Sequence, residues 1–406
     1  MKNKNNYKQV FLDIIRDLKA KNINSLYING RQIVIHDCAI PKQILEVNSF
    51  KKGLDLFIKD EILNDNLAKK TIVMNFLDII KKLLQSDSPS TVLIDLLDKL
   101  ERKLSNTKDF NVYVPLRGIK LLNKKNFKIS EISTILFLDE NSASELIPDK
   151  EIMDFFPCTI QHTIHSADFL KAIDQGVELS KLIVHFLRFV DYQGWDEGLL
   201  GLRLPGHGPL MEELRVIAVP IEPGNLKSYN WRLKEANDEM LIVDDMFLDD
   251  ANSTGFEVFS VLLMKYLNHQ LNQMETQIIR AIVWFGESKI DHDDSARFLK
   301  LTLVLECLLN LSKNEPVTVS LSDRVAFLLG NSLETRLSLY ERVQSLYSIR
   351  SEIVHNGSSD VDQESLFYLE HIVSELIILF LTNPEYSSIK TKKELRQKFN
   401  NIKFSD

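Results

Sequence analysis

Cysteine, glycine and proline are scarce in this chain. Its 406 residues include three cysteines, 14 glycines and 11 prolines. Cys38, Cys158 and Cys307 are odd in number and far apart, which excludes a disulfide framework and a four-cysteine zinc site. The few glycines follow no fixed period, which excludes a fibrous or low-complexity chain. We therefore expect a globular protein from a reducing compartment.

Long apolar runs are also missing. The run Leu376–Leu381 is far shorter than the roughly 18 consecutive apolar residues of a membrane-spanning helix. The N-terminus is basic, but the apolar segment and cleavage site of a secretory signal do not follow it. We expect a cytoplasmic protein without a membrane partner.

Neither basic nor acidic residues are in large excess. The chain has 49 basic and 57 acidic residues, and its formal net charge is −8. This balance argues against a generally basic surface that coats nucleic acid, although a local basic patch can still bind a phosphate backbone. With 44% hydrophobic residues, the chain has material for two or three domains.

The hydrophobic patterns divide the chain into four segments and predict an α+β protein. Residues 1–110 should be a mixed α/β region, with a hairpin turn at Asn29-Gly30. Residues 111–260 should be β-rich, with at least one helix near 167–188. The pattern over residues 261–385 predicts an all-α antiparallel helical bundle. Residues 386–406 should form a basic C-terminal tail.

Five helices are expected in and just before the bundle, each from an apolar face and its stop signals. Their predicted ranges are Phe256–Phe285, Ala296–Leu311, Ser322–Leu329, Leu333–His355 and a last helix from about Leu366 that ends before Pro384.

The fourth of these helices contains an arginine and a histidine separated by four residues, Arg350 and His355. The spacing alone is weak evidence, since the same pair recurs at Arg31 and His36 in a strand-like stretch, where we interpret it as coincidence. Arg350 differs because its helical neighbours at three and four positions are apolar, so it should project from the apolar face and need a partner or a cleft.

Glu306 is the expected partner, because it shares a face with Leu299 and Leu303 and should also be buried. One interpretation of the pair is a purely structural salt bridge. The other is the floor of a polar pocket between helices or subunits. His355 lies about 140° around the helix from Arg350, so it shares that pocket only if the arginine bends along the helix or a second chain completes the site.

Four blocks in this order resemble the Apea-like type of HEPN domain, which occurs in bacterial anti-phage defence and abortive-infection proteins. They are Ile279–Glu287, Leu301–Leu309, Leu321–Gly330 and Leu346–Gly357. The resemblance covers about residues 270–382.

The resemblance implies a metal-independent endoribonuclease, a hydrolase and toxin without a cofactor, that acts as a homodimer with two Arg-x4-His motifs facing each other. Arg350 would bind the scissile phosphate, and His355 would act as the base or acid in attack by the 2′-hydroxyl.

Ser351 stands where many members have Asn, Asp or His, and retains a hydrogen-bonding side chain. Glu306 matches an acidic position of this type and would orient Arg350. The substrate would be RNA such as tRNA or mRNA, and the β-rich region would sense a phage-derived trigger.

Two further patterns have competing interpretations. The tail carries Lys392, Lys393, Arg396 and Lys398, which could follow an RNA backbone or form a solvated end. His162 and His165 invite a metal site, but without an acidic or thiolate partner at a known spacing we predict none.

Two alternatives to a ribonuclease stay open. The first is a non-catalytic HEPN adaptor for dimerisation or for binding RNA or nucleotides, in which Glu306 and Arg350 are structural. The second is an independent enzyme in the β-rich region around His185, Asp191 and His207, although no nucleophile elbow, P-loop or zinc signature supports it.

Overall fold

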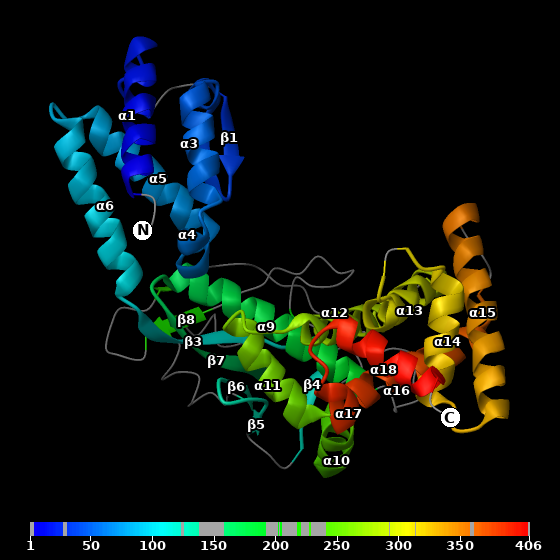
Figure 1. The fold of residues 1–406 in the computed structure, drawn as a ribbon. Helices are drawn as coiled ribbons and strands as arrows, with labels where there is room; N and C mark the ends of the chain where they lie inside the picture. Colours follow the sequence, from blue (N-terminus) through cyan, green and yellow to red (C-terminus); the bar gives the residue numbers. More distant parts are fainter. Residues whose placement is uncertain are drawn as a thin grey trace. The chain divides into compact units, whose positions relative to one another are not determined.

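The computed structural model of the chain describes residues 4–26, 31–122, 126–137, 158–191, 202, 204, 217–220, 227–228, 241–291, 293–312, 314–357 and 361–404. It confirms the predicted α+β class. Strands occur in the N-terminal and middle regions, and the described part of the C-terminal region is all helical (Figure 1).

The helices before the C-terminal region are α1 (Lys4–Ala20), α2 (Lys42–Leu45), α3 (Asn48–Ile58), α4 (Glu61–Asn66), α5 (Lys69–Leu84), α6 (Pro89–Ser105) and α9 (Phe169–Val190). The strands are β1 (Gln32–Ile35), β2 (Cys38–Pro41), β3 (Lys108–Pro115), β4 (Ile119–Leu121), β5 (Asn126–Lys128), β6 (Ser133–Phe137), β7 (Cys158–Ser166), β8 (Ile217–Pro220), β9 (Lys227–Ser228) and β10 (Leu241–Val243). The C-terminal helices are α10 (Asp245–Ser253), α11 (Phe256–Leu267), α12 (Gln273–Ser288), α13 (Asp294–Leu309), α14 (Val317–Leu329), α15 (Leu333–Asn356), α16 (Gln363–Thr382), α17 (Pro384–Ser387) and α18 (Lys392–Phe404).

The chain folds into two compact units. Unit 1 comprises residues 1–112, 163–176 and 217–228, and unit 2 comprises the remainder. Strands β3 and β7 and helix α9 therefore contribute residues to both units. Each unit therefore combines segments that are not consecutive in the sequence.

Unit 1 has an aromatic core inside a group of four helices, α1, α3, α5 and α6. Phe11, Phe50, Phe57 and Phe76 are fully buried and contact one another with ring centroids 5.2 to 5.7 Å apart. Such edge and tilted contacts are the favoured geometries for buried aromatic rings. Unit 1 therefore contains a hydrophobic core of its own.

A hairpin that the sequence patterns did not predict lies at residues 32–41. Strands β1 and β2 pair antiparallel with Ile35 opposite Cys38, so the turn is His36-Asp37. Both turn residues have positive φ, 46° and 60°, as a two-residue hairpin turn of this kind requires. Asn29-Gly30, the predicted turn, lies outside the described residues. His36, which belongs to the second Arg-x4-His pair, is therefore an exposed turn residue.

The main sheet has the strand order β5-β6-β7-β3-β8-β9. Its β6 and β7 pair antiparallel, with Ser133 opposite His162. His162 is fully buried, with Nδ1 2.8 Å from Ser133 Oγ and Nε2 2.7 Å from Ser180 Oγ. Since Ser180 belongs to α9, this histidine joins the sheet to the helix that covers it within unit 2.

The first long helix predicted for the C-terminal region is in fact two helices, α11 and α12. The chain turns between them because His269 adopts a left-handed conformation with φ 54°. Asn272 then caps α12 through a reciprocal capping box with Glu275. An apolar pattern that continues across the turn concealed this break.

Helices α13, α15 and α16 lie close to their predicted ranges, whereas α14 begins at Val317, five residues before the predicted Ser322. Helix α15 ends at Gly357, which has φ 81° and whose N–H donates to Ile353 O. Helix α16 buries its predicted stripe, Leu366, Leu369, Ile372, Val373, Leu376, Ile377 and Phe380. By length and composition α16 is apolar enough to cross a membrane, but most of its apolar stretch is buried, as in the core helix of a soluble protein.

Aromatic side chains join α9 to α11 and α12 in unit 2. Phe186 stacks on Phe259 with centroids 3.9 Å apart, and Phe189 packs edge-on against Phe285. At the crossing of α9 and α12, a Cβ on Gly286 would lie 2.7 Å from the Cα and Cβ of His185. Only glycine fits there without moving backbone.

We predict that Gly286→Ala destabilises unit 2. Alanine normally favours a helix over glycine by about 1 kcal/mol, but the clash with the His185 backbone should reverse this and cost about 2 kcal/mol net. Gly53→Ala is the matched control, because its Cβ would meet side-chain atoms of Ile14 and Val10 and no backbone atom among its three nearest neighbours. Urea unfolding followed by circular dichroism measures both, and equal midpoints for the two variants would contradict the packing described for α9 and α12.

A second prediction concerns pH. Burial lowers the pKa of His162 from about 6.5 to about 3. The folded state therefore binds fewer protons than the unfolded state, and the contribution of His162 to stability is lost as pH falls from about 6.5 towards 3. Between about pH 7 and pH 5 the wild type should lose about 1–2 kcal/mol more than His162→Gln.

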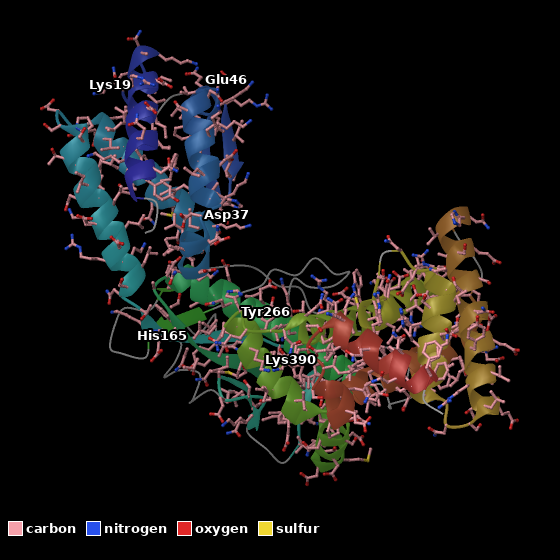
Figure 2. All side chains as sticks on the ribbon, viewed as in Figure 1. Lys19, Asp37, Glu46, His165, Tyr266 and Lys390 are labelled. Atoms are coloured by element: carbon pink, nitrogen blue, oxygen red, sulfur yellow. The ribbon has the colours of Figure 1, made fainter. Side chains whose placement is uncertain are left out.

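Urea titrations at the two pH values measure this difference. His165→Gln is the control, because His165 lies on the same strand with its side chain exposed (Figure 2). If wild type and His162→Gln lost the same stability on acidification, the buried neutral state of His162 would be disproved.

Candidate functional site

Helix α15 carries Arg350, Ser351 and His355. It begins at Ser332, whose side chain accepts from Thr335 N while the Thr335 side chain accepts from Ser332 N. It ends at the left-handed Gly357. Helical structure therefore extends through His355, and the three residues keep the angular spacing predicted for them.

The structure brings Arg350 and Glu306 together, as the sequence predicts. Arg350 Nη2 lies 3.5 Å from Glu306 Oε1, which joins α15 to α13. The pair is less buried than expected, with 34% of the arginine side chain and 23% of the glutamate side chain exposed. The reason is that the apolar face of α15 is narrower than predicted, since Leu346, Tyr347 and Ile353 are buried but Val354 is 50% exposed.

Tyr347 is part of this site, although sequence reasoning placed it among the apolar residues. Its hydroxyl donates to Glu306 Oε1 over 3.5 Å, the same oxygen that faces Arg350. Burial, and then the negative charge of Glu306, raise the pKa of Tyr347. The tyrosine therefore remains a hydrogen-bond donor to the carboxylate.

The guanidinium of Arg350 is only partly satisfied. Its Nε is buried and has no hydrogen-bond partner among the described residues. Its contact with Glu306 is long for a charged hydrogen bond, which is normally 2.7–2.9 Å. The group retains donors for an anion that approaches from its exposed side.

Ser351 and His355 are exposed on α15. Within the described part of the chain, neither makes a hydrogen bond or ion pair with Arg350 or Glu306. His355 occupies the last turn of the helix. One chain thus brings together Glu306, Tyr347 and Arg350 but not His355.

The predicted basic tail is a docked helix, α18, with Leu395 and Phe399 buried. Lys392 Nζ donates to Asn310 O over 2.7 Å, and Arg396 Nη2 donates to Leu311 O over 3.1 Å. Lys398 Nζ pairs with Glu385 over 2.8 Å, whereas Lys393 is exposed. Three of the four predicted RNA-binding side chains therefore contact the protein itself, and RNA binding by the tail stays a prediction.

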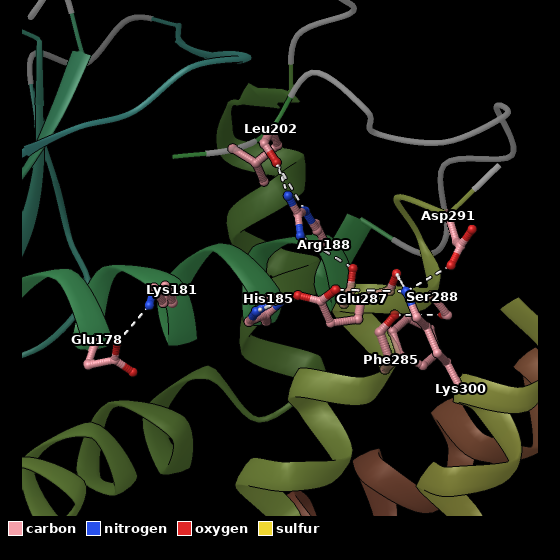
Figure 3. Close-up of polar contacts among 11 residues, drawn as sticks. Glu178, Lys181, His185, Arg188, Leu202, Phe285, Glu287, Ser288, Asp291 and Lys300 are labelled. Atoms are coloured by element: carbon pink, nitrogen blue, oxygen red, sulfur yellow. Dashed lines mark hydrogen bonds and ion pairs between the residues drawn. The ribbon is translucent and has the colours of Figure 1, made fainter. Parts of the chain in front are cut away.

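Of the alternative group in the β-rich region, His185 lies on α9 (Figure 3), and Asp191 directly follows that helix. His185 Nε2 lies 3.4 Å from Glu287 Oε1, and burial raises the pKa of Asp191 to about 6 against the opposing effect of Lys289. Arg188, 2% exposed, donates to Leu202 O and Gly286 O. His207 lies outside the described residues. The described contacts of His185 and Arg188 connect α9 to α12, which is a structural role.

His162 and His165 do not form a metal site together. His162 is buried between two serines, and His165 Nδ1 lies 2.7 Å from Asp109 with both side chains exposed. Over the described ranges, no group of three or more His, Cys, Asp or Glu side chains is placed to hold a metal ion.

Comparisons with protein-family models, with curated proteins and with solved structures found no match to this chain. The likeness to a HEPN domain therefore depends on the four sequence blocks alone.

We predict that the two arginines differ in their contribution to stability. Arg350→Ala should cost about 1 kcal/mol, because its partner Glu306 is partly exposed and can be hydrated. Arg188→Ala should cost about 3 kcal/mol or more, because it leaves buried carbonyl groups without their donor. Thermal unfolding at neutral pH compares them. A larger loss for Arg350→Ala would show that the Glu306 pair is chiefly structural.

Proposed function

We propose that this chain is a metal-independent HEPN endoribonuclease. The observation that supports the proposal best is the incompletely satisfied guanidinium of Arg350, held beside the Glu306 carboxylate and one and a half helical turns from an exposed His355. A guanidinium with free donors matches the geometry of a phosphate group.

In this proposal Arg350 binds the scissile phosphate and neutralises the charge that develops in the transition state. Glu306 and Tyr347 orient it through Oε1 of the carboxylate. His355 removes the proton from the ribose 2′-hydroxyl or protonates the leaving 5′-oxygen, because an imidazole can act as a general base or as a general acid. Ser351 donates a hydrogen bond to the phosphate. The products are a 2′,3′-cyclic phosphate and a 5′-hydroxyl.

The separation of Arg350 and His355 on α15 favours a homodimer whose composite site combines residues of two chains. Leu333 and Leu337, four residues apart on one face of the same helix, are 75% and 54% exposed. Apolar side chains exposed on a helix face favour contact with a second copy. Dimerisation through the helical region would bring a second set of motifs to the site.

The biological role in this proposal is anti-phage defence by abortive infection in the cytoplasm. The active enzyme would act as a toxin on tRNA or mRNA. The regions before the helical bundle would sense a phage-derived trigger or hold the nuclease inactive. A separate compact unit with its own aromatic core, unit 1, suits such a sensing role.

The second candidate is a non-catalytic HEPN adaptor that dimerises or binds RNA or nucleotides. The observation that favours it is the absence, over the described residues, of a contact between His355 and the Glu306, Tyr347 and Arg350 group. In an adaptor the arginine would bind an anion without cleaving it.

The deciding experiment is cleavage of total RNA and of tRNA in EDTA, with end-group analysis of the fragments. Arg350→Ala and His355→Ala should each lower cleavage at least about 100-fold, since each removes a group that acts in the transition state. Arg342→Ala is the matched control on the same helix, because Arg342 pairs at the surface with Glu364 and should leave cleavage unchanged.

Metal-free fragments with cyclic phosphate ends, produced by wild type and Arg342→Ala alone, would support the ribonuclease. Undiminished cleavage by both site variants would exclude it. RNA binding without cleavage, lost in Arg350→Ala but kept in His355→Ala, would support the adaptor.

A further inference from the structure

Three cations bind three consecutive backbone carbonyls at the C-terminal end of α13. Arg324 Nη1, on α14, donates to Leu309 O over 2.8 Å. Lys392 and Arg396, on α18, donate to Asn310 O and Leu311 O over 2.7 and 3.1 Å. Leu309 is the last residue of α13, and Asn310 and Leu311 directly follow the helix. The contact from Arg324 therefore satisfies a carbonyl that lacks a partner inside the helix, and the two contacts from α18 fix the segment that leaves it.

A carboxylate connects two of these cations to each other. Glu315 Oε2 lies 2.6 Å from Arg324, and Glu315 Oε1 lies 3.0 Å from Arg396. The guanidinium of Arg324 also lies over the ring of Phe399, 5.8 Å from its centroid. Since Leu395 and Phe399 are buried, α18 is fixed by both apolar and charged contacts.

The end of α13 also carries Glu306. Its backbone carbonyl accepts from Asn310 N over 3.0 Å, so Glu306 belongs to the last hydrogen-bonded turn that the cations hold. The contacts of the Glu306 side chain with Arg350 and with Tyr347 are both long, at 3.5 Å. These long contacts cannot fix the carboxylate by themselves, because hydrogen bonds weaken at such distances.

We infer that Lys392 and Arg396 are positioning residues, which hold the last turn of α13 so that the Glu306 carboxylate faces Arg350. Helix α18 therefore serves the site through the protein itself and not by binding the RNA backbone. The inference concerns the site of the ribonuclease proposed above, and its catalytic consequence rests on that proposal.

Hydrogen exchange at the end of α13 tests the structural part directly. In Lys392→Met and Arg396→Met, the amide of Asn310 and its neighbours should exchange at least about tenfold faster than in wild type, while the amides in the middle of α13 keep their rates. Lys393→Met is the matched control, because it removes the same charge from an exposed neighbouring position and should leave these rates unchanged.

Lys392→Arg keeps a donor and should restore the protection of these amides from exchange. If Arg396→Met does not fold, Lys392→Met decides alone. Unchanged exchange in the variants that fold would overturn the inference.

Cleavage kinetics test the catalytic part, since a misplaced orienting group lowers turnover more than substrate binding. We expect kcat to fall about 10- to 100-fold in Lys392→Met, with KM within about twofold of wild type and recovery in Lys392→Arg. If KM rises instead, with a shallower salt dependence of RNA binding, α18 binds phosphate and the inference is overturned.

Hydrogen exchange can be measured whether or not the protein cleaves RNA, so it distinguishes a failure of the positioning inference from a failure of the ribonuclease proposal. If wild-type protein cleaves no RNA, the ribonuclease proposal fails, and faster exchange in Lys392→Met still supports the placement of Glu306 by α18. Faster exchange with unchanged kcat in an active enzyme would overturn the positioning role.

Discussion

The packing of α9 against α12 is the constraint on which the rest of unit 2 depends. Because Gly286 has no side chain, the backbone of α9 approaches α12 closely enough for Phe186 and Phe189 to pack against Phe259 and Phe285. Helix α12 in turn packs along α13, and α13 packs against α15. The position of Glu306 relative to Arg350 therefore depends on a series of helix contacts that begins where the sheet meets α9.

Helices with one clear apolar stripe were predictable from the sequence, because burial of that stripe is what stabilises them. Helix α16 shows this, and Gly357 marked the end of α15 correctly. The break between α11 and α12 was not predictable from periodicity, because it arises from the left-handed backbone of His269 while apolar residues continue on both sides. The turn at His36-Asp37 was not predicted, because neither residue is a strong turn signal, although both carry the positive φ that the turn requires.

The candidate site was predictable only where both partners lie on apolar helix faces. Glu306 and Arg350 satisfied that condition, whereas the hydroxyl of Tyr347 was missed because a tyrosine in an apolar stripe is counted as a hydrophobic residue. The partners of Lys392 and Arg396 are backbone carbonyls of another helix, and no side-chain pattern reveals them. The spacing of Leu395 and Phe399 was the available signal that the tail is an amphipathic helix.

Two arginines of unit 2 show how the fold distributes satisfied and unsatisfied charge. Arg188 is buried and donates to backbone carbonyls, so its hydrogen bonds offset the cost of removing it from water. Arg350 has one long ion pair, a buried Nε without a described partner, and a third of its side chain exposed. An arrangement selected for stability alone would shorten that pair or replace it by apolar side chains, which often stabilise a core more than an ion pair does. In the role proposed for Arg350, a bound anion would supply partners for the exposed guanidinium donors that Glu306 leaves incompletely paired.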